Sequence, residues 1–190
     1  MTKEVIRKQS AAYRRGLTDA VHQQLSASIC TRVAKHEAFR RARTVHLYWP
    51  MLAHREVDTR PLIQAAWDEG KRVVVPVVAR FGRNVTTTPR LRHIAITPDT
   101  PLAPNRWGIP EPQAGPTVPL ADLDLVVVPA LAFDRAGYRV GHGFGYYDEF
   151  LGSLSVHRVG LCYAACLHDA VPHERHDIAV DNVMTELETI

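Results

Sequence analysis

The part of the sequence best suited to binding an anion lies between residues 139 and 148. It contains three glycines at alternate positions: Gly141, Gly143 and Gly145. Glycines leave backbone amides unobstructed, and the helix expected over residues 146–151 would direct its positive N-terminal end at the same place. Arg139 supplies a fixed charge that can grip phosphate oxygens, and Asp148 is a hard oxygen donor suited to magnesium. The segment therefore predicts a phosphate cradle for a nucleotide with bound magnesium.

The glycine pattern alone has a second interpretation. Alternating glycines also occur in turns that simply let a strand approach a helix. The segment is not a Walker loop, because no Gly-Lys-Ser or Gly-Lys-Thr follows, and it lacks the glycine spacing of a dinucleotide-binding fingerprint. The glycines by themselves leave the phosphate cradle and the plain turn both open.

Strands and helices alternate along the chain, which is the pattern of an open α/β domain. Strands are expected at residues 44–49, 72–77, 123–128 and 156–162, and helices at 3–15, 19–33 and 59–69. Strands that are apolar on both faces, as here, are typical of parallel sheets covered by helices. We expect one domain over residues 1–190, with three α/β/α layers and a mostly parallel open sheet.

Two further expectations concern how these elements pack. Val21, Leu25, Ile29 and Val33 recur every four residues, which predicts a helix stripe that packs on the sheet. The proline-rich stretch 89–119 is expected to be mostly loop. Because ligands bind at the carboxyl ends of the strands in such sheets, chemistry is expected just after four residues: Trp49, Val77, Val128 and Cys162.

The composition favours a small anionic ligand over a polymer. The 190 residues include 23 Lys and Arg against 20 Asp and Glu, and the basic residues are spread along the chain. No apolar run approaches the roughly 18 residues of a membrane span, and the first residues lack the pattern of a secretory signal. Three cysteines in a reducing compartment are expected as thiols. We expect a cytoplasmic monomer that binds neither nucleic acid nor membrane.

Residues 129–148 read Pro-x-Leu-Ala-Phe-Asp, then, after two residues, Gly-Tyr-Arg-Val-Gly-x-Gly-x-Gly-Tyr-Tyr-Asp. This string resembles the signature of the 5-formyltetrahydrofolate cyclo-ligase family. Other elements similar to those of the family follow its order along nearly the whole chain, and nothing aligns between residues 81 and 105. These elements are Lys3 with Arg7, Glu56-Val57-Asp58-Thr59, Trp107-Gly108-Ile109-Pro110-Glu111-Pro112, and the closing set Pro172, Glu174, His176, Asp177, Asp181, Thr185 and Glu186.

The resemblance implies an enzyme that uses ATP and magnesium to convert 5-formyltetrahydrofolate into 5,10-methenyltetrahydrofolate, with release of ADP and phosphate. Phosphorylation of the formyl oxygen makes a leaving group, and nitrogen 10 of the same folate then attacks and closes the ring. The protein mainly positions the reactants and neutralises charge.

The resemblance also implies roles for individual residues, with Arg139 as the catalytic residue that stabilises charge on the transferred phosphoryl group. The residues implied to bind ATP are Lys3, Glu4, Val5, Ile6, Arg7, Arg139, Val140, Gly141, His142, Gly143, Phe144, Gly145, Tyr146 and Tyr147. Those implied to bind the folate are Met51, Glu56, His142, Gly143, Phe144, Gly145 and Tyr146. Magnesium is implied to bind Asp148 and Asp177.

Several of these residues also fit simpler roles. Asp58 precedes a helix and is suited to hydrogen-bonding its N-terminus. Lys3 and Arg7, one turn apart, fit a solvated helix face, and Trp49 and Tyr147 fit a hydrophobic core. A rival zinc site would use the following thiols and imidazoles: Cys162, Cys166, His168, His173 and His176.

The sequence departs from the family pattern at two places. Phe144 stands where relatives often carry Gly or Lys, and Cys166 where they often carry glutamine. A bulky ring in the glycine loop and a missing amide leave two alternatives open. One is an ATP-dependent phosphotransferase acting on another substrate, and the other is a folate- or nucleotide-binding protein without turnover.

Overall fold

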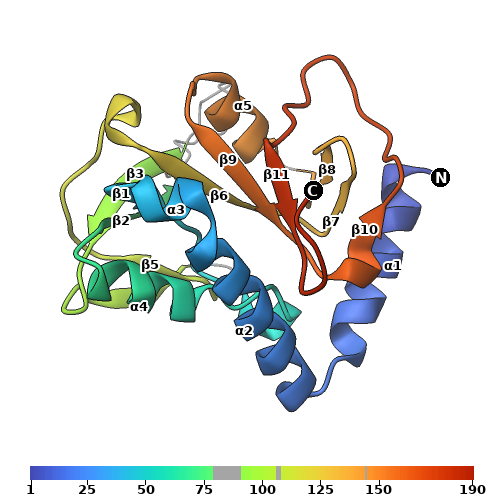
Figure 1. The fold of residues 1–190 in the computed structure, drawn as a ribbon, viewed down its shortest axis with the longest axis horizontal. Coiled ribbons are helices and arrows are strands. Elements are labelled where there is room, and N and C mark those ends of the chain that lie inside the picture. Colours follow the sequence, from blue (N-terminus) through green and yellow to red (C-terminus); the bar gives the residue numbers. More distant parts are fainter. Residues whose placement is uncertain (79–90, 106–107, 144) are drawn as a thin grey trace.

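The computed structural model describes residues 1–78, 91–105, 108–143 and 145–190. Within these ranges the main sheet has six strands in the order β11-β9-β6-β1-β2-β3 (Figure 1). Their bounds are β1 Thr44–His46, β2 Arg72–Val78, β3 Leu91–Ile96, β6 Leu125–Pro129, β9 His157–Leu161 and β11 Asn182–Met184.

The main sheet is mostly parallel, as predicted. β1 pairs in parallel with both β2 and β6, and β6–β9 and β9–β11 are also parallel pairs. β3 is the exception, since it runs antiparallel to β2 at the edge of the sheet. β6 carries apolar side chains on both faces, and all of β1 and the first four residues of β6 are buried. This burial requires a covering layer on each side of the sheet.

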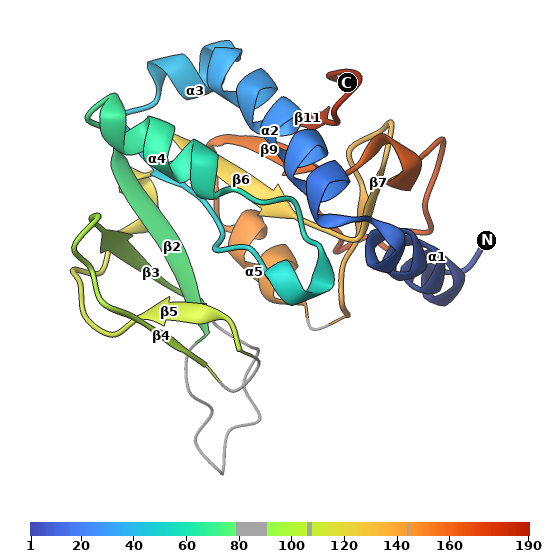
Figure 2. The ribbon, with the colours of Figure 1, turned by 90° about the horizontal axis from the view of Figure 1, so that it is seen from below.

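Helices cover both faces and give the predicted three layers. Figure 2 shows α2, α3 and α4 on one face of the sheet and α5 on the other. α1 packs beside a smaller sheet near the N-terminus (Figure 1). The helix bounds are α1 Lys3–Gly16, α2 Asp19–Lys35, α3 Glu37–Arg41, α4 Arg60–Asp68 and α5 Tyr146–Gly152, with short 3-10 turns η1 Leu52–His54, η2 Leu120–Asp122 and η3 Ala164–Cys166. None of the helices in the described ranges has the length and apolarity of a membrane span.

Thr2 and Thr18 begin the first two helices. Each Thr hydroxyl accepts a hydrogen bond from the backbone amide three residues later, which satisfies one of the free amides at a helix start. The expectation for Asp58 is also confirmed. Its carboxylate accepts from the backbone amide of Arg60, the first residue of α4, and from the Arg60 guanidinium.

The predicted apolar stripe of α2 is wrong at its N-terminal end. Ile29 and Val33 are fully buried, but Val21 is 40% exposed. A spacing of four residues rotates by about 40° per step around an α-helix, so a stripe that faces the sheet at residue 33 has turned away three steps earlier. His22 and Ser26 occupy the buried face instead. They hold the segment that follows β1, because the His22 ring and the Ser26 hydroxyl bond to the backbone of Glu56 and Asp58.

Most described residues of the stretch 89–119 lie outside strands, as expected, but that expectation missed three strands. The described part of this stretch contains β3, β4 Leu102–Pro104 and β5 Pro110–Pro112. β3 buries Ile94 and Ile96 against the sheet, while β4 and β5 form a separate two-stranded ribbon. Proline is tolerated in edge strands and short ribbons because its missing amide can face solvent there, so proline content alone was a poor guide.

The chain leaves the middle strand β1 in one direction and returns on its other side. α4 leads from β1 to β2, whereas β6 pairs with the opposite edge of β1. In open α/β sheets such a reversal leaves a crevice outside the carboxyl ends of the two strands, and ligands bind there. The segments after β1 and β6 therefore define where a site is expected.

Candidate active site

The glycine loop, residues 141–145, directly follows a short hairpin that comes after β6 in the chain. β7 Ala132–Asp134 and β8 Arg139–Val140 form this hairpin, and β10 Leu167–His168 adds a third strand. One Asp134 carboxylate oxygen accepts from the amides of Ala136 and Tyr138 at 3.0 and 2.9 Å, and the other accepts from Val171. Asp134 therefore fixes both the turn before Arg139 and the C-terminal segment beside it. The sequence analysis assigned Asp134 no role, although an Asp at the start of a turn, with its side chain bonded to the backbone amide two residues on, is a known turn signal.

Arg139 is buried, contacts one predicted metal ligand, Asp148, and lies within electrostatic range of the other, Asp177. Its guanidinium donates to the Asp148 carboxylate and, at 2.6 Å, to the carbonyl oxygen of Ile178. Burial lowers the pKa of Arg139 below its ordinary value, and the negative charges of Asp148 and Asp177 oppose that shift. The guanidinium stays protonated, since arginine does not lose its proton in proteins. The structure thus brings together three of the predicted residues, Arg139, Asp148 and Asp177.

Asp177 is itself paired with the first helix. Lys3 Nζ lies 2.6 Å from its carboxylate, and the amide of Glu174 donates to the same oxygen at 2.8 Å. Burial would raise the pKa of Asp177, but these two hydrogen bonds and the Lys3 charge outweigh it, so the pKa is lowered. Asp177 is therefore an ionised carboxylate at neutral pH, as a magnesium ligand must be.

Of the five predicted nucleotide-binding residues on α1, one contacts the glycine loop and another contacts the C-terminal segment. Arg7 donates from Nε to the carbonyl oxygen of Gly141 at 2.8 Å, and Lys3 contacts Asp177. Glu4 instead pairs with Lys8 on the solvent face. Ile6 is fully buried in the core and Val5 is exposed. The solvated-face interpretation of Lys3 and Arg7 does not describe them, because both side chains reach other segments of the chain.

The backbone of the loop needs its glycines at two positions. Gly143 and Gly145 have φ values of 95° and 74°, in the left-handed region that residues with side chains rarely adopt. A Cβ on Gly143 would also lie 3.4 Å from Nη2 of Arg7, so the loop and α1 are close together. Gly145 directly precedes α5, and Tyr146, Tyr147 and Asp148 form its first turn. His142 is exposed, Val140 is buried, and Phe144 lies outside the described residues.

Glu56 is the buried carboxylate of the segment after β1. Only 5% of the residue is exposed, and the backbone amide of Met51 donates to its Oε2 atom at 2.9 Å. Burial raises the pKa of Glu56, while the charge of Arg14 and the Met51 hydrogen bond oppose the shift. The two predicted folate ligands Met51 and Glu56 thus contact each other.

Tyr147 connects the two halves of the site electrostatically. Burial raises the pKa of its hydroxyl, the charge of Glu56 adds to the shift, and the charge of Arg139 opposes it. The hydroxyl is buried and has no hydrogen-bond partner among the described residues. The Tyr147 hydroxyl is therefore within electrostatic range of both Glu56, a predicted folate ligand, and Arg139, a predicted phosphate ligand. Trp49 packs partly buried against the core, as its simpler interpretation held.

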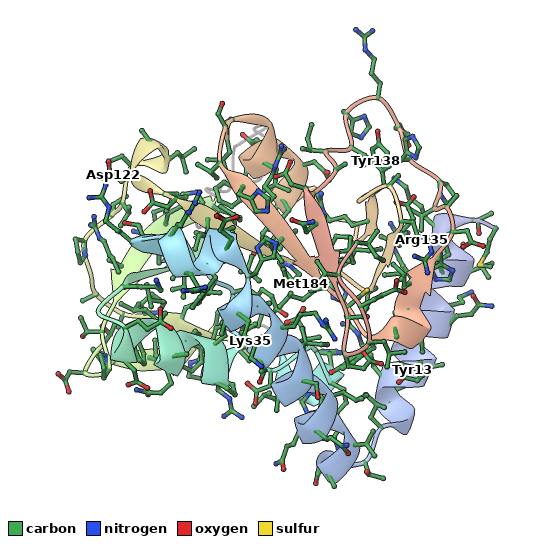
Figure 3. All side chains as sticks on the ribbon, in the orientation of Figure 1. Tyr13, Lys35, Asp122, Arg135, Tyr138 and Met184 are labelled. Atoms are coloured by element: carbon green, nitrogen blue, oxygen red, sulfur yellow. The ribbon has the colours of Figure 1, made fainter. Side chains whose placement is uncertain are left out.

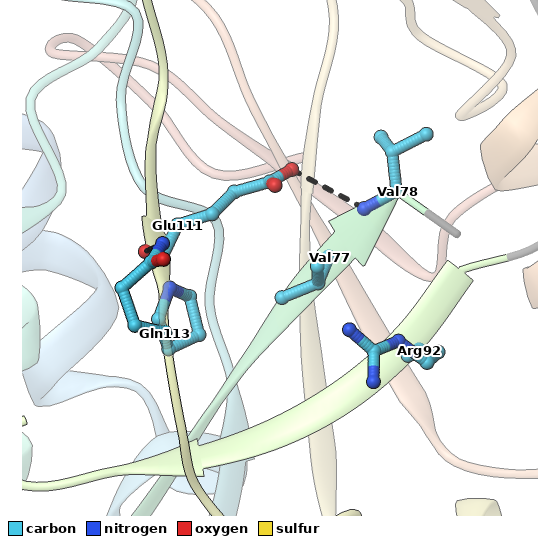
Figure 4. Close-up of a pocket in the computed structure, with 6 residues that line it drawn as sticks. Val77, Val78, Arg92, Glu111 and Gln113 are labelled. Carbon is cyan, nitrogen blue, oxygen red and sulfur yellow. Dashed lines mark hydrogen bonds between the residues drawn. The ribbon is translucent and has the colours of Figure 1, made fainter. Parts of the chain in front are cut away.

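Two cavities among the described residues differ in their relation to this candidate site. One of about 160 Å³ is lined by Tyr146 of α5 together with His93 and Phe150. Behind it, His93 Nδ1 lies 3.1 Å from Nε2 of the buried His46. The other, of about 230 Å³, lies around Arg92 and Glu111, away from the glycine loop. Figure 4 shows Glu111 reaching across to the amide of Val78, which identifies a contact that joins β5 to β2.

The rival zinc set is not assembled. Across residues 1–78, 91–105, 108–143 and 145–190, no three or more His, Cys, Asp or Glu side chains are placed to hold a metal ion. Cys162 and Cys166 are buried, and burial raises the pKa of both thiols. His173 stacks on Tyr138 with ring centroids 3.7 Å apart, and His176 is exposed. Two carboxylates, Asp148 and Asp177, remain as candidates for a hard cation.

The chain is therefore an open α/β protein in which a cationic glycine loop and a buried carboxylate lie near the crevice beside β1. The sequence matches the 5-formyltetrahydrofolate cyclo-ligase family over residues 1–186. The chain belongs to that family, whose members form a ring by ligation.

Relatives and solved structures agree with this assignment. The 5-formyltetrahydrofolate cyclo-ligase of Haemophilus influenzae is 30% identical over 187 residues, covering 96% of each chain, and that of Escherichia coli K12 is 32% identical over 90% of this chain and 93% of its own. The NMR structure of Aquifex aeolicus 5,10-methenyltetrahydrofolate synthetase superposes with a TM-score of 0.82 at 29% identity, covering all of this chain and 92% of the other. A synthetase from Mycoplasma pneumoniae shares the fold, with a TM-score of 0.75 at 23% identity.

Proposed function

We propose that this enzyme converts 5-formyltetrahydrofolate into 5,10-methenyltetrahydrofolate and that ATP with magnesium drives the reaction. The observation that carries the proposal is the convergence at one sheet edge of a cationic glycine loop and a buried carboxylate, within a chain of the cyclo-ligase family. We also propose that the protein is a cytoplasmic monomer. Size-exclusion chromatography with light scattering tests the oligomeric state.

The triphosphate would bind between α1 and the glycine loop. Lys3, Arg7 and Arg139 are cations from two separate segments, and all three already contact the loop or the segment beside it. Glycine amides in the left-handed conformation present donors to an anion without side chains in the way. The carbonyl oxygen of Ile178 accepts from one side of the Arg139 guanidinium, so this contact can keep the group in place while it stabilises charge on the transferred phosphoryl group.

The two carboxylates that flank Arg139 fit a magnesium ion. Asp148 and Asp177 supply hard oxygen ligands, and magnesium in nucleotide sites is commonly held by one or two carboxylates with phosphates completing its shell. When bound, the ion would neutralise phosphate charge and help orient the triphosphate. Lys3 now donates to Asp177, and Arg139 donates to Asp148. When the nucleotide binds, these two cations would contact phosphate oxygens in place of the carboxylates, which would then be available to the ion.

The folate would bind on the Glu56 side of Tyr147. The pteridine ring carries N–H groups that can donate hydrogen bonds to a carboxylate. Glu56 is buried next to the crevice, and the backbone amide of Met51 orients its carboxylate. The rings of Tyr146 and Tyr147, on the first turn of α5, are suited to packing against the flat pteridine. This arrangement would place the formyl group next to the phosphate end of the nucleotide.

The chemistry requires little more than this positioning. The formyl oxygen attacks the γ-phosphorus and the bond to ADP breaks. Nitrogen 10 then attacks the formyl carbon, its proton is released, and the bond from carbon to the phosphorylated oxygen breaks, which frees phosphate and leaves the methenyl ring. The residues of this chain hold the two substrates together and stabilise the charge that develops on phosphate.

The test is a spectrophotometric assay of purified protein with 5-formyltetrahydrofolate, ATP and magnesium that follows the near-ultraviolet absorbance of the methenyl product. We expect a rise that needs all three components. Arg139→Gln should reduce it by roughly 100-fold or more. Arg135→Gln is the matched control, because Arg135 lies in the same hairpin but pairs with Glu188 at the surface (Figure 3).

Two other outcomes would refute the proposed reaction, and a third would refute only the role of Arg139. ATP hydrolysis that ignores every folate would indicate a phosphotransferase acting on another substrate. Tight binding of ATP or folate without product would indicate a binding protein that has lost turnover. Full activity of the Arg139 variant would remove that residue from the mechanism while leaving the reaction in place.

A further inference from the structure

Arg14, in the last turn of α1, is an almost completely buried cation. Only 1% of the residue is exposed. Its Nη2 atom donates to the carbonyl oxygen of Ala130, just after β6, but Nε and Nη1 are buried and have no acceptor among the described residues. Among the described residues, no carboxylate lies within ion-pair distance of the Arg14 guanidinium. The guanidinium therefore keeps free donors and an unpaired charge inside the protein.

A buried guanidinium of this kind destabilises the folded protein, so its presence is better explained by ligand binding than by folding. Buried donors without acceptors and unpaired charges destabilise a fold, and an apolar side chain of similar length would fill the same space at lower free energy. Arginine cannot avoid the charge by losing its proton. Free donors on a fixed cation thus point to an acceptor that belongs to a ligand.

Arg14 is placed where a ligand is expected. Its hydrogen bond to Ala130 puts it at the end of β6, and its charge lowers the pKa values of Tyr48 and Glu56 after β1 against the stronger effect of burial. Tyr163, just after β9, has its ring centroid 6.0 Å from the guanidinium carbon. Arg14 thus lies at the carboxyl end of β6, near the point where the strand order reverses and where a ligand is expected.

The chemistry of the proposed substrate supplies the missing acceptor. Along one edge, the pteridine ring of a reduced folate presents two N–H donor groups next to a carbonyl oxygen. Glu56 can accept from the donors, and a guanidinium beside it can donate to the oxygen with its planar fork of N–H groups. We infer that Arg14 binds the ring carbonyl oxygen of the folate beside Glu56 and so selects 4-oxo pteridines. This inference rests on the proposed function.

The test is Arg14→Met, measured by isothermal titration calorimetry with three ligands and with ATP. 5-Formyltetrahydrofolate and 5-methyltetrahydrofolate both carry the ring carbonyl, but the second lacks the formyl oxygen. Methotrexate carries an amino group in place of the ring carbonyl. We expect both folates to bind about 10- to 100-fold more weakly, as for loss of a hydrogen bond to a charged group. Methotrexate and ATP should bind as they do to the unaltered protein.

Arg15→Met is the matched control, because Arg15 is the next residue on α1 and is exposed. Thermal unfolding separates a ligand-binding role from a structural one. A ligand-binding Arg14 predicts that Arg14→Met melts at the same or a higher temperature than the unaltered protein. Arg14→Lys keeps the charge without the planar fork and should recover part of the folate affinity; this variant carries the test if the Met variant does not fold.

Each remaining result counts against the inference. Unchanged folate affinity in both Arg14 variants would refute it, and loss confined to 5-formyltetrahydrofolate would assign the contact to the formyl oxygen. A lower melting temperature in both variants, with folate affinity retained, would make Arg14 a structural residue. If the unaltered protein binds no folate, the proposed function fails as well, and this result is distinct from the others.

Discussion

Replacement of Lys3 by Met should change metal binding and nucleotide binding in opposite directions. Lys3 now occupies the Asp177 carboxylate at 2.6 Å, and the two side chains are 26% and 13% exposed. Partly exposed ion pairs contribute up to about 1 kcal/mol, so removal of the competing ammonium should strengthen binding of magnesium alone by up to about fivefold. Removal of a charged phosphate ligand should weaken binding of magnesium-ATP by about 10- to 100-fold.

Isothermal titration with magnesium alone and then with magnesium-ATP measures both effects on one sample. Lys8→Met is the control, since Lys8 lies on the same helix but pairs with Glu4 on the solvent face. Both variants should keep their thermal stability to within about 1 kcal/mol. If the two affinities fall together in the Lys3 variant, or if the Lys8 variant behaves identically, the exchange of Asp177 for phosphate is wrong.

Three further predictions concern the metal, the turn and the buried histidines. Asp148→Asn should raise the magnesium concentration for half-maximal activity by about tenfold, and an unaltered magnesium titration would count against a metal-binding role. Gly137→Ala should destabilise the protein by more than about 2 kcal/mol, because φ is 86° and the new Cβ would lie 2.4 Å from the Val180 carbonyl oxygen, whereas Gly16→Ala meets no such contact; denaturant unfolding compares them. Burial lowers the pKa of His93 to about 4. The neutral His93 ring contributes at most about 3 kcal/mol to the free energy of unfolding. This contribution is present above pH 6.5, the pKa of the ring in the unfolded chain, and is lost as the pH falls toward 4. The free energy of unfolding of His93→Gln, measured across that pH range, should therefore depend less steeply on pH.

The layers of the fold were predictable from local patterns, and the same patterns locate the candidate site. Runs such as Leu125–Pro129 are apolar on both faces, which specifies a parallel sheet between helices, and such a sheet places its site at the carboxyl ends of the strands. The glycine loop was visible as a motif, but its glycines left a phosphate cradle and a plain turn both open, and only the family resemblance favoured the cradle. These features depend on residues close together in the sequence.

What could not be predicted depends on contacts between distant segments. The strand β3 follows from its pairing with β2, which the proline content around it obscured. The pairing of Lys3 with Asp177 joins residues 174 positions apart, and only the family resemblance pointed to both. Arg14 carried one weak signal: it lies eight residues after the buried Ile6, on the same side of α1. An arginine on the buried side of a helix is unusual enough to be examined as a functional residue.

The spacing of cations on α1 relates the two ends of the proposed site. Lys3 and Arg7 reach the glycine loop and the segment beside it, whereas Arg14 reaches the end of β6. At 1.5 Å per residue, Lys3 and Arg14 are separated by roughly 16 Å along the helix axis. That length is comparable to a triphosphate and a pteridine placed end to end. A single rigid helix would therefore hold the phosphate ligands and the pteridine ligand at a fixed separation, and correct docking of α1 would align the γ-phosphate with the formyl oxygen.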